Sequence, residues 1–559
     1  MMTLTMKNWL ALSLFFPLLA VADTKVIYNA NGYTPTYKGE LTQFSTLVIK
    51  DGKVVKVGTD ELKNSFPNAH SFDAKQKTLL PGLIDAHGHV IGLGQNLSQL
   101  DLRGSKSVKS IQAKLADFAK GKDGWIIGRG WNQELWPSKQ FPTAADLDKV
   151  IKDVPVVLSR VDGHAIWVNS KAMALANITS STRAPDGGEI IRTRDGKPSG
   201  IFIDKAEGLI TPFIPSPSDN AINQALDKAG NHLLSLGITS THDAGIDKQT
   251  WQIYKQRAEQ ETLPLRIVAM LSATDPALEA MLKAGRFKDL NDYMSIRSVK
   301  IYADGALGSR GAALIEDYAD RKNHKGLMLE TQQKLETLFT LSFSNGFSAN
   351  THAIGDQANK TVLNAYENVF KNTGGILLRN RIEHAQIVNP TDIPRFKALK
   401  IIPSMQPVHA TSDMHMAEQR LTEKQLTGAY AWQTFLSQGS VVAAGSDFPV
   451  ELANPFHGLY SAITRMDHHL KPKNGWRADE ALSREDALRA FTLGGAYAAH
   501  QEFKLGSLEQ GKWADFILVD KDYFSVPVDE IYSIGVEQTW IAGELKYQKT
   551  NVNGVDKAE

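Results

Sequence analysis

Two histidines one residue apart, His87 and His89, stand at the end of the apolar segment LPGLIDAHGHV. Side chains at positions i and i+2 of a β-strand point to the same face, so a strand here would direct both imidazoles toward one point. Such a pair suits chelation of a divalent metal. Taken alone, such a pair is common, and it is more often two polar residues in a loop. The rest of the chain must decide between these interpretations.

Further metal-competent residues occur on other predicted strands. Short apolar runs alternate with helical patterns and predict a (β/α)8 TIM barrel. The runs are 83–89, 237–243, 266–271, 298–305, 347–356, 381–386, 401–406 and 441–447. Active sites of this fold lie at the C-terminal ends of the strands. Lys300, His352, His384 and Asp447 fall on the fourth, fifth, sixth and eighth runs, so they and the histidine pair predict a metal site.

Individual members of this set have structural alternatives. His384 could pair with its neighbour Glu383, and Lys300 could pair with Asp304. The chain has no cysteine, so any metal must be held by His, Asp, Glu or a modified Lys. Six such residues at the same end of one barrel favour the metal site over six independent structural roles.

Regions outside the barrel follow other patterns. Lys7, a short apolar run and the triplet Ala20-Val21-Ala22 predict a cleaved signal peptide, hence a periplasmic or secreted protein without membrane association. Hairpin-like strands near both ends predict one composite β-sandwich, and two separate flaps are the alternative. The predicted divisions are a signal peptide at 1–22, sandwich strands at 23–79, the barrel at 80–503 with an α/β insertion at about 104–235, and further sandwich strands at 504–559.

Composition narrows the classes of partner. Of the 559 residues, 42% are hydrophobic, which is enough for a large core. The 62 Lys and Arg residues nearly balance 61 Asp and Glu residues, so no strong field points to nucleic acid or a membrane surface. We therefore expect a small-molecule substrate. Whether the chain forms a homo-oligomer stays open.

The chain resembles the amidohydrolase superfamily over nearly all of its mature length. It is most similar to the amidohydrolase 3 family, the branch of N-substituted formamide deformylase-like hydrolases. The resemblance rests on the motifs PGLIDAHGH, RGWNQELW, RVDGHAIWVNS, VKIYADGALGSRGA, THAIGD, RIEHAQ, GSDFPV and LGSLEQGKWADFILVD. The metal positions it implies are His87, His89, Lys300, His352, His384 and Asp447.

The resemblance also implies a modification. Lys300 matches a barrel lysine that is carbamylated to N6-carboxylysine in several branches, where it bridges two metals. A carbamate offers two anionic oxygens, whereas an ammonium repels divalent ions. One or two ions are therefore expected. Zinc is favoured by the nitrogen-rich ligands, although iron, manganese and cobalt also fit.

The leading hypothesis is a metal-dependent hydrolase that cleaves a non-peptide C–N bond of a small amide or formamide-like substrate. Metal-activated hydroxide would attack the carbon, with Asp447 as the catalytic proton carrier. Deamination of a heterocycle or opening of a cyclic amide would use the same chemistry. A hypothesis of another class is a non-catalytic regulatory or ligand-binding protein on the same scaffold, but the full ligand set argues against it.

Substrate contacts are predicted at four polar or aromatic residues. His164 and His409 are expected to face the pocket, Arg310 to bind a carboxylate or carbonyl, and Trp131 to form an aromatic wall with Trp136. Core packing or salt bridging is the alternative for each.

Overall fold

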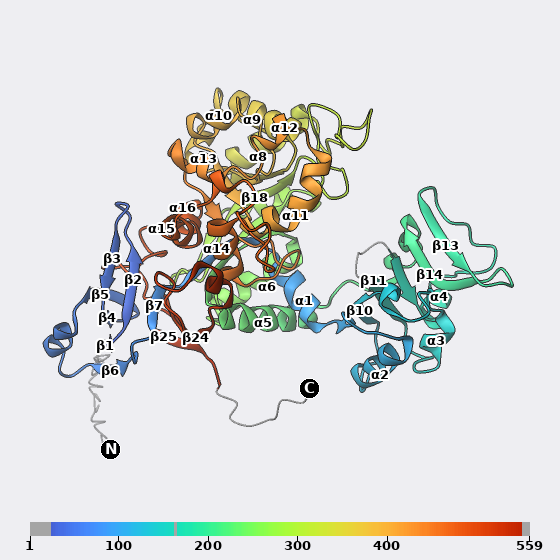
Figure 1. The fold of residues 1–559 in the computed structure, drawn as a ribbon, viewed down its shortest axis with the longest axis horizontal. Coiled ribbons are helices and arrows are strands. Elements are labelled where there is room, and N and C mark those ends of the chain that lie inside the picture. Colours follow the sequence, from blue (N-terminus) through green and yellow to red (C-terminus); the bar gives the residue numbers. More distant parts are fainter. Residues whose placement is uncertain (1–23, 161–164, 551–559) are drawn as a thin grey trace, which may run out of the picture.

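Eight parallel strands form a nearly closed barrel at the centre of the molecule (Figure 1). The computed structural model describes residues 24–160 and 165–550. The barrel strands are, in order, β8 (Leu83–Gly88), β15 (Ile238–Ile246), β16 (Arg266–Ser272), β18 (Met294–Tyr302), β19 (Ser348–Ala353), β20 (Arg381–His384), β21 (Ile402–Met405) and β22 (Ala443–Ala444). The short antiparallel strand β17 (Phe287–Lys288) pairs with β18. A parallel bridge between Gly88 and Phe448 joins the segment after β22 to β8, which confirms the predicted barrel.

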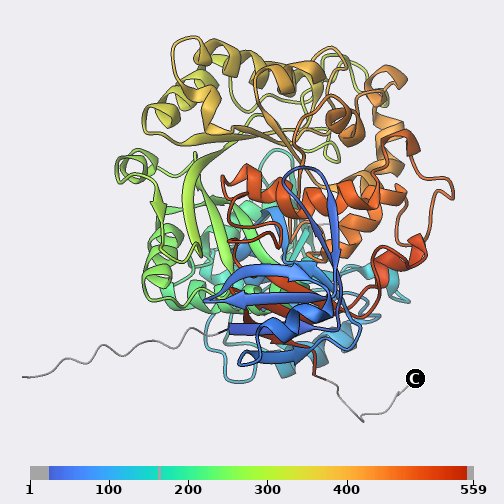
Figure 2. The same cartoon turned by 90° about the vertical axis from the view of Figure 1, so that its left-hand side faces the viewer.

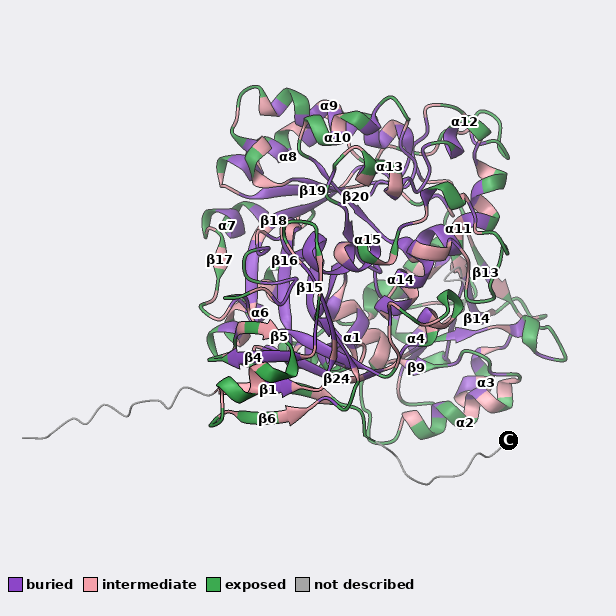
Figure 3. Ribbon diagram, turned by 60° about the vertical axis from the view of Figure 1, so that its left-hand side comes forward, coloured by how far each residue is buried: buried purple, intermediate pink, exposed green. Residues whose placement is uncertain are grey.

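Helices surround the barrel because each carries an apolar stripe. In α9 (Asp356–Phe370), Ala358, Val362, Ala365 and Val369 are all buried, as the helical period of the sequence predicts. The strands are instead buried along most of their length, and Figure 3 shows them largely in the buried colour beneath helices with exposed outer faces. The principal covering helices are α1 (Val90–Ser98), α5 (Asp219–Ser235), α6 (Lys248–Glu259), α7 (Leu278–Lys283), α8 (Gln332–Ser344), α10 (Ile393–Ala398), α11 (Pro407–Arg420), α13 (Trp432–Ser437) and α14 (Pro455–Thr464).

Strands from both ends of the chain combine in a β-sandwich, seen in blue and red in Figure 2. One sheet has the order β5-β4-β1-β6 and the other β25-β24-β23-β7-β2-β3. The N-terminal strands are β1 (Thr24–Tyr28), β2 (Asn31–Pro35), β3 (Leu41–Phe44), β4 (Thr46–Lys50), β5 (Lys53–Gly58), β6 (His70–Asp73) and β7 (Thr78–Pro81). The C-terminal strands are β23 (Phe516–Val519), β24 (Val536–Ile541) and β25 (Glu544–Gln548). Because β23 pairs with β7, neither end could complete this sheet alone.

The insertion is an α/β subdomain that stands beside the barrel (Figure 1). Its six-stranded sheet has the order β13-β14-β12-β11-β10-β9, and it has hydrophobic clusters of its own. Its elements are β9 (Leu100–Asp101), α2 (Val108–Phe118), β10 (Ile126–Trp131), α3 (Ala144–Asp148), β11 (Val156–Arg160), β12 (Ala165–Val168), α4 (Ser170–Leu175), β13 (Gly188–Arg192) and β14 (Pro198–Asp204). It joins the barrel between α1 and α5, at the end where the β8 strand finishes.

Two sequence predictions fall on residues that the structure does not describe. The signal peptide at 1–22 and His164 lie outside the described ranges. Within those ranges, no helix is both long enough and apolar enough to cross a bilayer.

Candidate metal centre

Metal-competent side chains converge at the C-terminal end of the barrel. The nearest ligand atoms of His87, His384 and Asp447 all lie within 4.8 Å of one another, and all three residues are buried. They come from β8, β20 and the segment after β22, which are neighbours only because the barrel closes. Among the residues that the structure describes, this trio can hold a metal ion.

The other three predicted ligands border this trio. His89 Nε2 lies 3.2 Å from Asp447 Oδ1, and Lys300 Nζ lies 3.0 Å from His87 Nε2. The His352 ring centroid is 4.5 Å from that of His384. The structure thus brings all six residues to one place, although they span 360 positions of sequence (87 to 447).

Backbone geometry at the strand ends aims these side chains. The β8 strand stops at Gly88 and His89 is the N-cap residue of α1, yet its ring centroid remains 5.7 Å from that of His87. His384 and Asp447 both adopt positive φ, 75° and 63°. Non-glycine residues seldom occupy this region, and such strain concentrates at functional sites.

Protonation in the site favours metal binding. Burial, together with the charge of Lys300, lowers the pKa of His87 to about 4 and that of His352 to about 3. Burial alone would raise the pKa of Asp447, but its contact with His89 and the charge of His87 bring it well below its usual range. The imidazoles of His87 and His352 are therefore neutral with free lone pairs, and the carboxylate of Asp447 is ionised.

Two buried polar atoms of the predicted ligands lack any hydrogen-bond partner. They are Asp447 Oδ1 and His352 Nε2. Buried polar atoms are nearly always paired, because leaving them unpaired is costly. A divalent cation would satisfy both, so the donor set fits a metal.

Neighbouring side chains hold the histidines in orientation. His87 Nδ1 lies 2.5 Å from Glu383 Oε2, and His384 Nδ1 lies 2.8 Å from Gln406 Oε1. The alternative in which Glu383 pairs with His384 is therefore wrong, because adjacent strand residues point in opposite directions. A glutamate inside an apolar barrel strand was the sequence signal for this contact.

Lys300 does not pair with Asp304 either. The Asp304 carboxylate instead accepts hydrogen bonds from three backbone N–H groups, those of Ala313, Ile354 and Gly355. Burial lowers the pKa of Lys300 to about 8. Because its Nζ lies 3.0 Å from His87 Nε2, the amine lies in the metal-ligand cluster rather than in a structural ion pair.

His409 borders the same site, as predicted for a substrate contact. Its Nε2 lies 3.8 Å from Asp447 Oδ2 and has no hydrogen-bond partner. Its Nδ1 is held by the side-chain amide of Gln386 at 3.1 Å, and its ring stacks on that of His384 with centroids 5.9 Å apart. His409 thus presents an unpaired nitrogen to the space beside Asp447.

The structure places two predicted substrate residues elsewhere. Trp131 is completely buried in the core of the inserted subdomain, where it packs against Trp136 and Trp167. Arg310 forms a two-pronged ion pair with Asp320, so a carboxylate of the chain already occupies its guanidinium. Both predictions need correction: the aromatic cluster is structural, and Arg310 is engaged within its own loop.

Comparison with known proteins agrees with this geometry. The model of the amidohydrolase family matches residues 71–547. The protein LONG AFTER FAR-RED 3 of Arabidopsis thaliana is 33% identical over 553 residues, which cover 96% of this chain and 93% of that protein. N-substituted formamide deformylase of Arthrobacter pascens is 26% identical over 546 residues, covering 94% and 98%.

A solved structure agrees as well. The crystal structure of an uncharacterized metal-dependent hydrolase from Pyrococcus horikoshii OT3 superimposes with a TM-score of 0.76 at 27% identity. The match covers 90% of this chain and 99% of that one. The family match spans the barrel and the sandwich strands β7, β23, β24 and β25, and the site carries a metal-competent ligand group where a barrel hydrolase needs it. The chain is therefore a hydrolase that belongs to the amidohydrolase family.

Proposed function

We propose that this hydrolase cleaves a non-peptide C–N bond in a small amide or formamide-like compound. The observation that carries the proposal is the state of Asp447. Its carboxylate is ionised and buried, its Oδ1 has no hydrogen-bond partner, and it lies among His87, His89 and His409. A carboxylate so placed can both take and return a proton, which amide hydrolysis requires.

We assign the following roles to the side chains of the site in the proposed hydrolysis. Four histidines, Lys300 and Asp447 would hold the divalent metal, which when bound supplies Lewis acidity and lowers the pKa of water. Asp447 accepts a proton from the water whose oxygen attacks the carbonyl carbon. The C–N bond then breaks, and Asp447 returns the proton to the departing nitrogen. His409 Nε2 lies beside the reacting atoms and is placed to hydrogen-bond the carbonyl oxygen.

Lys300 is proposed to be N6-carboxylated. Its Nζ lies 3.0 Å from His87 Nε2, inside the ligand group and without a carboxylate partner in the described residues. An ammonium in that place would oppose a divalent cation, whereas a carbamate would contribute anionic oxygens. Zinc suits the imidazole-rich set.

The proposed substrate class is supported by one relative. The Arthrobacter pascens relative is named for deformylation of N-substituted formamides, which is cleavage of a non-peptide C–N bond. The predicted signal peptide supports the further proposal that this reaction occurs in the periplasm or outside the cell, with a small molecule as the substrate.

A substrate panel with two variants tests the proposal. The purified zinc-loaded protein is assayed with N-alkyl formamides, simple amides, cyclic amides and dipeptides, in parallel with Asp447→Asn and, as a control, Glu502→Gln. We expect turnover of an amide or formamide that Asp447→Asn loses and Glu502→Gln retains. Turnover of dipeptides alone would overturn the substrate class, and equal activity in Asp447→Asn would overturn the role of the carboxylate.

A further inference from the structure

A charged layer lies inside the barrel directly behind the metal-ligand group. It consists of Arg381 and Glu383 on β20 and His242 on β15, all almost completely buried. Barrel interiors are usually filled by branched apolar side chains. Burial of a carboxylate and a guanidinium costs free energy unless each is paired, so the presence of these side chains in the barrel interior suggests a specific role.

The contacts of the layer lead to one metal-competent histidine. Glu383 Oε2 is 2.5 Å from His87 Nδ1, and Glu383 Oε1 is 3.3 Å from Arg381 Nε. Arg381 Nη1 donates to the carbonyl oxygen of Ala86 at 3.2 Å and to His242 Nδ1 at 3.0 Å. Arg381 therefore holds both the carboxylate and the backbone beside His87.

An ionised carboxylate can only accept hydrogen bonds. Next to Glu383, Nδ1 of His87 must therefore carry the ring proton, which leaves the lone pair on Nε2. That Nε2 is the atom that faces Lys300 and Asp447, at 3.0 and 3.7 Å. The carboxylate also makes the imidazole a stronger electron donor, as in the carboxylate–histidine–metal arrangement.

We propose that Glu383, itself held by Arg381, is a positioning residue that keeps His87 in the tautomer able to bind the metal. This rests on the proposed metal-dependent function. Glu383 touches neither substrate nor reacting atoms, and acts only through His87. The competing structural role is that Glu383 serves only as the counter-ion of Arg381.

Zinc affinity of three variants separates these roles. We measure the dissociation constant by competition with a chromogenic chelator for Glu383→Gln, for the double variant Arg381→Met/Glu383→Gln, and for Glu502→Gln. The last variant is a matched control, because Glu502 is also buried and paired with an arginine, Arg379, at 2.6 Å. We expect about 10- to 100-fold weaker binding for both Glu383 variants and no change in the control.

The double variant is decisive because it leaves no buried charge unpaired and so avoids the folding defect of the single change. Zinc affinity restored to the wild-type value in the double variant would overturn the proposal and leave the counter-ion role. An equal loss of affinity in Glu502→Gln would overturn it too, because the effect would then be general.

A second measurement does not depend on metal. In the metal-free wild-type protein, nitrogen-15 spectroscopy of the histidines, with His87 assigned from His87→Gln, should show a proton on Nδ1 of His87. A proton on Nε2 instead would overturn the tautomer assignment. If the wild-type protein bound no zinc while the Nδ1 proton was present, the proposed function would fail and the positioning contact would stand.

Discussion

The two ends of the barrel each bury a charged cluster, and the clusters differ in whether their polar atoms are paired. At the N-terminal end, Arg266 binds Asp515 through two hydrogen bonds of 2.7 and 3.0 Å, and its third nitrogen donates to the carbonyl oxygen of Asn291. At the C-terminal end, Asp447 Oδ1 and His409 Nε2 are buried without partners. The polar atoms of the first cluster are paired within the chain, whereas two atoms of the second are free to bind a group from outside the chain. We call these the paired end and the open end of the barrel.

The paired cluster has a structural role that its position explains. Arg266 begins β16, while Asp515 directly precedes β23 of the sandwich, so the pair joins barrel to sandwich. Tyr293 and Trp513 flank the guanidinium at 4.7 and 5.1 Å. Removing one partner of such a buried pair lowers the stability of the fold strongly, because the other charge is left buried without a counter-ion.

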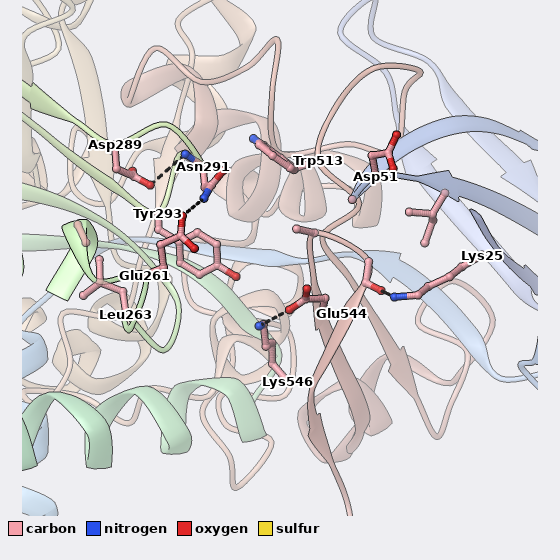
Figure 4. Close-up of a pocket in the computed structure, with 15 residues that line it drawn as sticks. Lys25, Asp51, Glu261, Leu263, Asp289, Asn291, Tyr293, Trp513, Glu544 and Lys546 are labelled. Atoms are coloured by element: carbon pink, nitrogen blue, oxygen red, sulfur yellow. Dashed lines mark hydrogen bonds and ion pairs between the residues drawn. The ribbon is translucent and has the colours of Figure 1, made fainter. Parts of the chain in front are cut away.

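A cavity at the paired end is lined by none of the six predicted metal ligands. A cavity of about 420 Å³ lies at the paired end, between sandwich and barrel, and Figure 4 shows Tyr293, Trp513, Asp51 and Lys25 on its walls. None of the metal-competent residues lines it. Unpaired, converging donors therefore identify the site at the C-terminal end of the barrel.

The largest expected effect is at the open end. Asp447→Asn removes the proton carrier but keeps the size of the side chain, so kcat/KM for the amide identified in the substrate panel should fall by about 10²–10⁴-fold. Thermal unfolding of the metal-free protein should change little, since no complete ion pair is lost. Steady-state kinetics and a melting curve check both parts. A large loss of stability with modest loss of activity would make Asp447 structural and remove the contrast between the ends.

At the paired end the expected effect is on stability. Arg266→Met leaves Asp515 buried and unpaired, which should cost about 3–5 kcal/mol in the free energy of unfolding. Denaturant titration measures it, with zinc affinity expected to stay at the wild-type value. The double variant Arg266→Met/Asp515→Leu is the control and should recover most of the loss. A cost below about 1 kcal/mol in the single variant would be typical of an exposed pair and would contradict the comparison.

The metal content of a Lys300 variant tests whether this lysine helps to bind metal at the open end. If Lys300 is carboxylated and bridges two ions, Lys300→Ala should bind about one ion fewer per chain than the wild-type protein. Elemental analysis after zinc reconstitution gives the count, and an intact-mass increase of one carboxyl group on the wild-type protein reports the modification. Equal metal content in both proteins would argue for a mononuclear site with an unmodified lysine.

The smallest effect is expected in the inserted subdomain. Trp131→Phe removes the hydrogen bond that the indole donates to the carbonyl oxygen of Leu158 at 2.7 Å, and stability should fall by about 1–3 kcal/mol. Trp136→Phe loses a similar bond to Ser105 and serves as the matched variant. KM should not change in either. An increased KM in Trp131→Phe with an unaltered melting temperature would indicate that Trp131 contacts the substrate.

Much of the site could be predicted because strand ends are visible in the sequence. Histidines that follow apolar runs, such as His87 and His384, must emerge at one end of a parallel barrel whatever the details of packing. Glu383 could be noticed only as an ionisable residue in an apolar strand. Its partner, 296 positions away, depends on how β20 and β8 face each other across the barrel.

The two incorrect predictions of substrate contacts also arose because packing cannot be read from the sequence. Trp131 and Arg310 are residue types that often contact ligands, and nothing local distinguishes a pocket wall from a subdomain core or an engaged ion pair. Exposure and pairing are properties of the packed chain, so residues near in sequence can differ completely in both.

The sequence by itself determined the alternation of strands and helices, the six metal-competent residues and the end of the barrel at which they meet. These follow from hydrophobic periodicity and from the side to which a strand directs its side chains. Only the tertiary structure decided which donors stay unpaired, which carboxylate holds His87 and which charges are neutralised, because a hydrogen bond depends on atoms brought within about 3 Å by closure of the whole barrel.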